Sequence, residues 1–276
     1  MKVGLFVDFS EEMLRWAGEA GFRSVELRLA PGGGMDAERI LAGEAERVKR
    51  VCEGCGLEIS AVGHYPNHLD PDPERRREHA EYFLKLIDAA SLLGAPVVCT
   101  FAGRDPARSI EDNIEDFKRH FEPLVERAAE RGVKIAFENC PGGHNIAISP
   151  YAWELMFKAI DSPVVGLEFD PSHLVWQGID YVKAVYEFGE RIYHVHAKDT
   201  EIIRPELERK GIFGSGWWRY RIPGWGEVDW RRFVAALLDV GYEGNLDIEH
   251  EDPVFHGERF KEGLLLGLRF LSQFVV

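Results

Sequence analysis

Short runs rich in β-branched and other apolar residues alternate with longer amphipathic stretches along the whole chain, and this alternation constrains the fold more than any other feature. Such alternation is typical of parallel strands joined by crossover helices. Eight runs predict eight strands. They are residues 2–8, 24–29, 57–63, 96–101, 133–138, 164–170, 191–196 and 244–249.

Eight βα units can close into a barrel or form an open doubly wound sheet. The first run is followed by VDFSEE and not by the G-x-G-x-x-G of a dinucleotide-binding sheet. A length of 276 residues fits one barrel. We therefore predict a single (β/α)₈ TIM barrel domain over residues 1–276, in which the long irregular stretch 197–227 after the seventh strand is a candidate lid.

Several predicted helices end on a glycine just before the next strand, where glycine tolerates the left-handed conformation of a helix cap. These glycines are Gly21, Gly56, Gly94, Gly132 and Gly241.

The charge balance, 33 basic against 47 acidic residues, gives a formal charge of -14. The electrostatic field of this negative charge disfavours nucleic acids and anionic membranes as partners.

The sequence has no signal peptide pattern and no apolar segment of about 18 residues, so we expect a cytoplasmic protein. Cys52 and Cys55 form a C-x-x-C without a second cysteine pair, and we assign them no function.

Ionisable residues end four consecutive predicted strands, at the edge where barrels of this kind carry their active sites. They are Glu138, Asp170, His196 and Glu249. Alternate residues of a strand share a face, so three of the four have an ionisable neighbour deeper on the same face. These neighbours are Glu168, His194 and Asp247.

Three carboxylates and one imidazole form a hard, mostly oxygen ligand set that suits Mn²⁺, Mg²⁺ or Co²⁺. The charge of a cation offsets the mutual repulsion of the carboxylates. Each residue alone has a structural explanation, such as capping the next helix. Their common position on adjacent strands favours a joint site.

Five short motifs resemble those of the xylose isomerase-like TIM-barrel superfamily, and the resemblance covers nearly the whole chain. The superfamily includes ketose 3-epimerases, inosose dehydratase/isomerase proteins and endonuclease IV. The resemblance implies one divalent metal, Mn²⁺ first and Mg²⁺, Co²⁺ or Zn²⁺ as alternatives, on Glu138, Asp170, His196 and Glu249. The motifs are FEN at 137–139, DPSH at 170–173, HVHAKD at 194–199, PGWGEVDW at 223–230 and IEHED at 248–252.

The resemblance also implies that Glu138 and Glu249 act as an acid/base pair on a small carbohydrate whose carbonyl is chelated by the metal. Isomerisation or epimerisation of a sugar, keto-sugar or cyclitol is the first expectation. A keto-glycoside lyase or cyclitol dehydratase stays open, because loss of a β-substituent begins with the same proton abstraction.

Substrate contacts are expected from strand-end and lid residues, namely His64, His173, Lys198, Trp218 and Arg219. Each has an alternative explanation. His64 can bond loop backbone, Lys198 can pair with Asp199 or Glu201, and the lid aromatics can anchor the lid or bury at a subunit interface. A homo-oligomer is compatible with the sequence.

An abasic-site endonuclease of the endonuclease IV type is less favoured. Such enzymes hold three zinc ions and need extra histidine and aspartate ligands. Here the fourth predicted strand ends in Phe101-Ala102 without a histidine, and PGWGEVDW lacks their D-x-H. The acidic net charge argues in the same direction.

Overall fold

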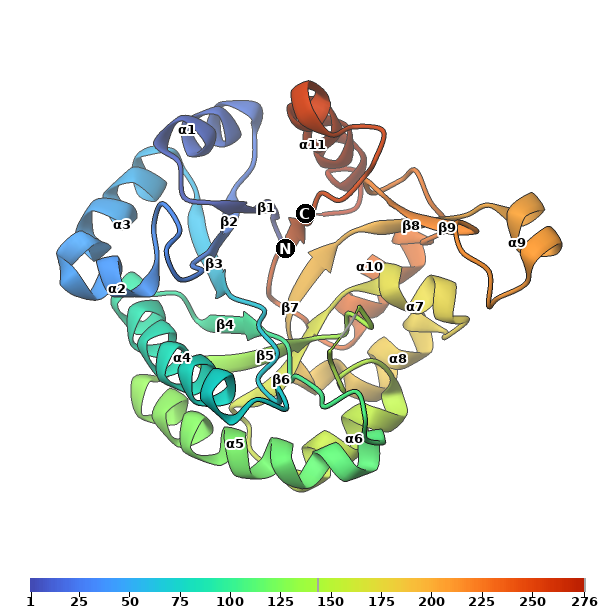
Figure 1. Ribbon diagram of the computed structural model, residues 1–276. Helices are drawn as coiled ribbons and strands as arrows, with labels where there is room; N and C mark the ends of the chain where they lie inside the picture. Colours follow the sequence, from blue (N-terminus) through green and yellow to red (C-terminus); the bar gives the residue numbers. More distant parts are fainter. Residues whose placement is uncertain (143, 276) are drawn as a thin grey trace.

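The computed structural model describes residues 1–142 and 144–275, and it contains a closed barrel of parallel strands surrounded by helices (Figure 1). The strand order around the barrel is β1-β10-β7-β6-β5-β4-β3-β2. The predicted (β/α)₈ fold is confirmed, and each predicted run overlaps one barrel strand. The strands are β1 Val3–Asp8, β2 Ser24–Arg28, β3 Glu58–Gly63, β4 Val97–Thr100, β5 Lys134–Glu138, β6 Val165–Phe169, β7 Ile192–Ala197 and β10 Leu246–Ile248.

The helices form the outer layer, and many of their ends follow local sequence signals. Ser10 caps the first helix by accepting a hydrogen bond from the Met13 backbone N–H at 3.4 Å. All five glycines predicted at helix ends have positive φ. The α-helices are α1 Glu11–Ala20, α2 Ala37–Arg39, α3 Ala45–Gly54, α4 Pro73–Leu93, α5 Ile110–Arg131, α6 Pro150–Ala159, α7 Pro171–Gln177, α8 Tyr181–Phe188, α9 Arg204–Lys210, α10 Trp230–Asp239 and α11 Phe260–Leu271. Short helical turns of other types are η1 Ile40–Glu44, η2 Gly189–Arg191 and η3 Gly257–Arg259.

The apolar core lies between the barrel and the helices. Phe121 of α5 is fully buried there, and its ring centroid lies 4.8 Å from that of Phe137 on β5 and 5.0 Å from that of Phe117. The contact with Phe137 is edge-on and the contact with Phe117 is tilted, and aromatic contacts of this kind add to the free energy of burial. Much of the apolar packing therefore lies between the helices and the outer face of the strands. The inner face of the strands can accordingly bear polar side chains.

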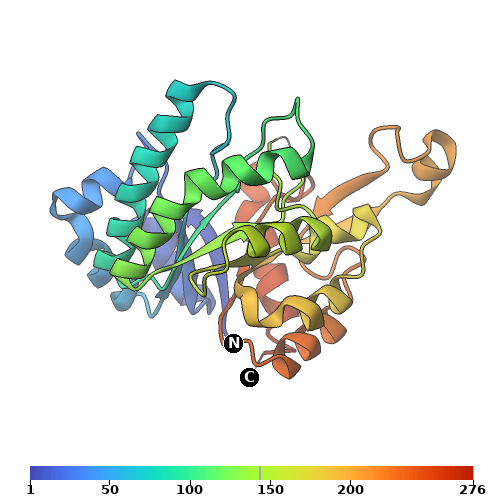
Figure 2. The same ribbon diagram turned by 90° about the horizontal axis from the view of Figure 1, so that it is seen from below.

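Residues 197–227 contain more regular structure than the irregular stretch predicted from the sequence. Strand β8, Asp199–Ile202, pairs antiparallel with β9, Trp218–Arg221, and α9 lies between them. Glu201 faces Arg219 across this pair, a favourable charge pairing. We call residues 199–221 the arm. Figures 1 and 2 show it extending away from the ring of helices.

No helix among the described residues is both long and apolar enough to cross a membrane.

Replacing Phe121 with alanine is expected to lower the free energy of unfolding by about 3–5 kcal/mol, because it removes a fully buried ring and leaves a cavity. The matched control is Phe213→Ala on the arm, where the side chain is 100% exposed and the expected change is within about 0.5 kcal/mol. Urea denaturation measures both. Equal losses in the two variants would contradict this location of the core.

Candidate functional site

The four predicted metal ligands lie together at the carboxyl ends of the strands. Glu138, Asp170 and Glu249 each offer an oxygen, and His173 a ring nitrogen, and these atoms all lie within 4.8 Å of one another. His196 Nδ1 lies 3.3 Å from Glu138 Oε1 and 3.4 Å from Glu249 Oε2. The structure thus brings Glu138, Asp170 and Glu249 together and places His196 beside two of them. It adds His173, which was expected to bind substrate, as a further possible ligand.

Asp170 has a carboxylate oxygen suited to a cation. Its Oδ1 accepts a hydrogen bond from the Ser172 backbone N–H at 2.8 Å, which caps α7. Its Oδ2 is buried and receives no hydrogen bond, although it lies 3.3 Å from both His173 Nε2 and Lys198 Nζ. Buried carboxylate oxygens normally have a partner. The donor set and this unpartnered oxygen therefore fit a bound divalent cation.

Asn139 fixes the relative position of two ligand-bearing strand ends. Its side-chain amide donates to the Asp170 backbone carbonyl at 2.8 Å, and its carbonyl oxygen accepts from the Asp170 backbone N–H at 2.7 Å. This reciprocal pair joins the end of β5 to the end of β6. The asparagine of the FEN motif thus helps to place Glu138 beside Asp170.

The two proposed acid/base glutamates are held in their charged form. Burial alone would raise the pKa of Glu138, but hydrogen bonds from His173 and His196 hold that pKa well below its usual range. Burial would also raise the pKa of Glu249, but Lys198 and His196 lower it to about 2. Both carboxylates are therefore anionic at neutral pH and able to bind a cation.

The imidazole of His196 carries the compensating charge. Burial favours its neutral form, but Glu168, Glu26 and Glu249 raise its pKa well above the ordinary value. Glu26 was not identified from the sequence. Its one signal is a charged residue in the middle of the apolar run SVEL.

Lys198 lies at the candidate site and does not pair with Asp199 or Glu201, the two alternatives considered from the sequence. Its ammonium group contacts Glu249, lies 2.8 Å from Glu251 Oε2 and packs 4.4 Å from the ring centroid of Tyr220. Asp199 instead accepts hydrogen bonds from the backbone at 224 and 228 and from the Trp230 indole. A buried lysine with carboxylate partners can hold a substrate hydroxyl or supply a proton.

The arm contacts the candidate metal cluster through Tyr220. The hydroxyl of Tyr220 lies 2.8 Å from His173 Nδ1, and His173 Nε2 lies 3.2 Å from Glu138 Oε1. Trp218 packs edge-on against Tyr220 at 4.9 Å and stacks on Trp176 at 4.6 Å. An aromatic wall therefore leads from the arm to the cluster.

The structure does not bring two of the predicted substrate residues to the cluster. Arg219 donates to Glu201 Oε2 at 2.7 Å on the arm. The His64 ring packs edge-on against Tyr82 at 5.1 Å, and burial lowers the pKa of His64 to about 4. The backbone N–H of His64 bonds to the Cys99 carbonyl.

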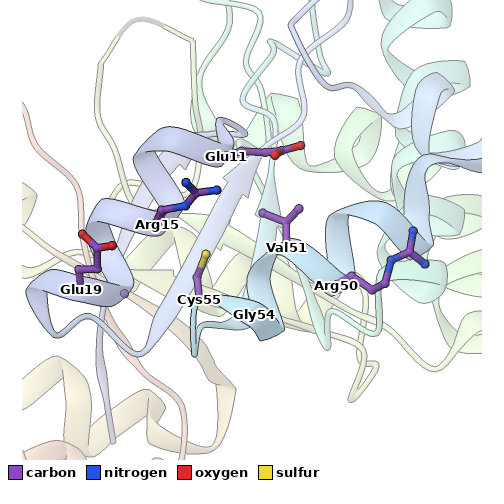
Figure 3. A pocket seen from close by; sticks show the side chains of 8 residues that line it. Glu11, Arg15, Glu19, Arg50, Val51, Gly54 and Cys55 are labelled. Atoms are coloured by element: carbon purple, nitrogen blue, oxygen red, sulfur yellow. The ribbon is translucent and has the colours of Figure 1, made fainter.

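A hollow of about 490 Å³ adjoins Glu249 at the mouth of the barrel, and this volume is typical of small-molecule pockets. Its lining includes Phe6, Asp8, Met13, Arg28, Glu251 and Phe260. A groove of about 560 Å³ lies between α1 and α3. Figure 3 shows Arg15 on α1, Arg50 on α3 and Cys55 just after the end of α3. The hollow adjoins Glu249, a predicted ligand, whereas the groove lies on the outer helical layer.

The sequence profile described as xylose isomerase-like TIM barrel matches residues 14–272. The chain is 28% identical to the uncharacterized protein YfiH of Bacillus subtilis (strain 168), over 88% of each. It is 27% identical to an inosose dehydratase of Clostridium botulinum, over 83% of this chain and 81% of that one. A 3-dehydroshikimate dehydratase of Pseudomonas putida is 25% identical over 83% of this chain, but this match spans only 35% of that longer protein.

Two solved structures show the same fold. The 3-keto-D-glucoside 4-epimerase YcjR of E. coli matches with a TM-score of 0.77 and 18% identity over 99% of each chain. The IOLI protein, solved with a bound zinc atom, matches with a TM-score of 0.77 and 16% identity, over 100% of this chain and 99% of that one. At these identities the likeness shows the fold alone.

Cation binding is expected to release at least one proton at neutral pH, because His196 has a raised pKa in the metal-free protein and must become neutral to act as a ligand. Affinity should therefore rise by about tenfold per pH unit for each proton released and weaken as the pH falls. Calorimetric titration with Mn²⁺ in buffers of different ionisation enthalpy measures the release. His196→Gln should release one proton fewer, and binding without proton release in the unchanged protein would contradict this charge assignment.

Proposed function

The chain belongs to the xylose isomerase-like TIM barrel family, and on that premise we propose that it is a metal-dependent isomerase or epimerase of a small carbohydrate. One observation carries the proposal. Three strand-end carboxylates and two imidazoles converge next to a hollow of about 490 Å³. The substrate is expected to be a sugar, keto-sugar or cyclitol with a carbonyl group.

The proposed cation ligands are Glu138, Asp170, His196 and Glu249. Three oxygens and one nitrogen favour Mn²⁺, with Mg²⁺, Co²⁺ and Zn²⁺ as alternatives. When bound, such a cation polarises the carbonyl of the substrate and so acidifies the hydrogen on the neighbouring carbon. Oδ2 of Asp170, which accepts no hydrogen bond although His173 Nε2 and Lys198 Nζ lie 3.3 Å away, supports a cation at this point.

Glu249 and Glu138 are the proposed proton-transfer groups, and they differ in access to the substrate. Glu249 adjoins the hollow and its side chain is 16% exposed, whereas that of Glu138 is 4% exposed. Glu249 is therefore placed to take the proton from carbon. Glu138, which ends β5, lies 3.2 Å from His173 Nε2, and the pKa of His173 is raised to about 10. In the proposed reaction the charged His173 gives its proton to Glu138, Glu138 returns that proton to the opposite face of the carbon, and the use of two carboxylates suits inversion there.

Dehydration or keto-glycoside cleavage is the second candidate, and Lys198 is the observation that favours it. Its ammonium lies between Glu249 and Asp170, where it can give a proton to a departing hydroxyl or alkoxide oxygen. Lys198 thereby becomes neutral, and the electron pair from the broken C–H bond forms the new double bond. The names of the inosose and dehydroshikimate dehydratases are consistent with this route.

Proton abstraction is tested by incubating the Mn²⁺-loaded protein with ketoses, inososes and keto-glycosides in D₂O. Deuterium is expected at the α-carbon of at least one compound, or a β-substituent is expected to leave. Glu138→Gln and Glu249→Gln should each lower the rate by roughly 10²–10⁴-fold, since each removes a positioned acid/base group. Proton NMR and mass spectrometry measure the exchange and distinguish an epimer from an elimination product.

The matched control for this experiment is Glu58→Gln. Glu58 begins β3, at the end of the barrel away from the proposed site, and it pairs with Lys2. It should retain most of the exchange. Wild-type exchange in both Glu138→Gln and Glu249→Gln, with the metal still bound, would refute the acid/base assignment.

The arm is proposed to form one wall of the substrate site, because Trp218 and Tyr220 connect it to His173. Trp218→Ala should raise KM while the metal content stays unchanged. Trp225→Ala is the control, since Trp225 is 48% exposed and packs against Phe255 instead. Steady-state kinetics and elemental analysis give the two readouts, and an unchanged KM in Trp218→Ala would remove the arm from the site.

A further inference from the structure

The two ring nitrogens of His196 face two different layers of the barrel. Nδ1 faces the mouth, where it lies 3.3 Å from Glu138 Oε1 and 3.4 Å from Glu249 Oε2. Nε2 faces the interior, where it bonds to Glu26 Oε2 at 2.8 Å. Nδ1 is therefore the nitrogen available to a cation at the mouth, while Nε2 is held by the buried carboxylate of Glu26.

Glu26 is itself fixed in place by Tyr65. The Tyr65 hydroxyl donates to Glu26 Oε1 at 2.6 Å, so Oε2 remains free to accept from imidazole groups. The same hydroxyl lies 3.0 Å from Glu168 Oε2. Glu26 is fully buried, so its carboxylate orientation depends on these protein partners alone.

Gly63 on β3 provides the space in which Glu26 and Tyr65 meet. A Cβ atom at this position would lie 2.3 Å from Glu26 Oε1 and 2.8 Å from the Tyr65 hydroxyl. Contacts this short are not tolerated, so any side chain at this position would displace both groups. The backbone of the neighbouring strand is thus shaped for the carboxylate of Glu26.

We propose that Glu26 is a positioning residue that keeps the proton on Nε2 of His196 when a cation binds and thereby aims the Nδ1 lone pair at that cation. This inference rests on the proposed function. The physical reason lies in the two nitrogens of a neutral imidazole. When one nitrogen donates its proton to a carboxylate, the other nitrogen has a free lone pair and can bind a cation. The carboxylate also fixes the orientation of the ring and increases the basicity of that second nitrogen. Glu26 acts through His196 and does not touch the substrate.

Asp247 provides a matched comparison at the same depth in the barrel. Its carboxylate accepts from Ser24 Oγ at 2.6 Å and lies 3.3 Å from His194 Nε2. Glu26 also bonds to His194, at 3.1 Å. Both carboxylates are fully buried, but of the two only Glu26 bonds to His196. Glu168 Oε1 also lies near His196 Nε2, at 3.0 Å, but Asp247 does not bond to this ring. A general loss of interior packing would affect both Glu26→Gln and Asp247→Asn, whereas loss of positioning would follow Glu26 and not Asp247.

The test compares Glu26→Gln with Asp247→Asn by calorimetric titration of the metal-free proteins with Zn²⁺, which is diamagnetic. Glu26→Gln should bind Zn²⁺ about 10- to 100-fold more weakly than the unchanged protein, as is typical when the partner of a ligating histidine is removed. Asp247→Asn should bind at the wild-type affinity. Thermal unfolding of the metal-free variants establishes that both are folded.

A second readout follows the tautomer directly. Long-range ¹H–¹⁵N NMR of the Zn²⁺-loaded unchanged protein should show His196 protonated at Nε2 and bound through Nδ1. A loss of packing alone would not change this pattern.

If Glu26→Gln does not fold, Tyr65→Phe replaces it. This variant removes the hydroxyl that fixes Glu26 and should also weaken Zn²⁺ binding relative to Asp247→Asn.

The outcomes separate this inference from the proposed function. If the unchanged protein binds no Zn²⁺ or Mn²⁺, the proposed function fails and the positioning role fails with it. If it binds but Glu26→Gln binds as tightly, only the positioning role is wrong. Equal weakening in Glu26→Gln and Asp247→Asn, or a proton on Nδ1 of His196 in the Zn²⁺-loaded unchanged protein, would likewise overturn the positioning role alone.

Discussion

The pairing of buried carboxylates with imidazoles and with one lysine is the interaction on which the rest of this structure depends. Glu26, Glu168 and Asp247 are fully buried inside the barrel, and His194 and His196 lie among them. A single unpaired charge at such a depth would cost several kcal/mol. The barrel can hold these groups only because each lies within reach of an opposite charge or a hydrogen-bond donor.

This polar interior changes how the barrel is packed. Glycines on two strands leave room for carboxylates from neighbouring strands, since a Cβ at Gly4 would lie 2.0 Å from Asp247 Oδ1 and one at Gly63 would lie 2.3 Å from Glu26 Oε1. Apolar packing is correspondingly concentrated between the strands and the helices, where Phe121 and Phe137 lie. The fold is stabilised mainly outside the barrel, while its inside positions charge.

The arm makes the mouth of the barrel asymmetric. It follows β7 and returns to the site through Tyr220, whose hydroxyl contacts the ring of His173 beside Glu138. On the other side, the hollow next to Glu249 is bordered by β1 and β2 residues such as Phe6 and Arg28. The ligand-bearing strand ends therefore meet the arm through Tyr220 and the hollow through Glu249.

The sequence by itself determined the eight barrel strands and the positions at which four ionisable residues end them, because the alternation of side chains and the change of period between strand and helix are local properties. The sequence does not predict the regular structure of the arm, because β8 and β9 are only four residues long and pair across the intervening α9, so no local pattern marks them. Only the tertiary structure decided which side chains meet across the barrel. It joined Glu26 and Tyr65 to His196, brought His173 into the ligand cluster, and left His64 and Arg219 with other partners. The physical reason is that barrel closure, register and loop path set the distances between strands, and none of these is encoded in the spacing of residues along one strand.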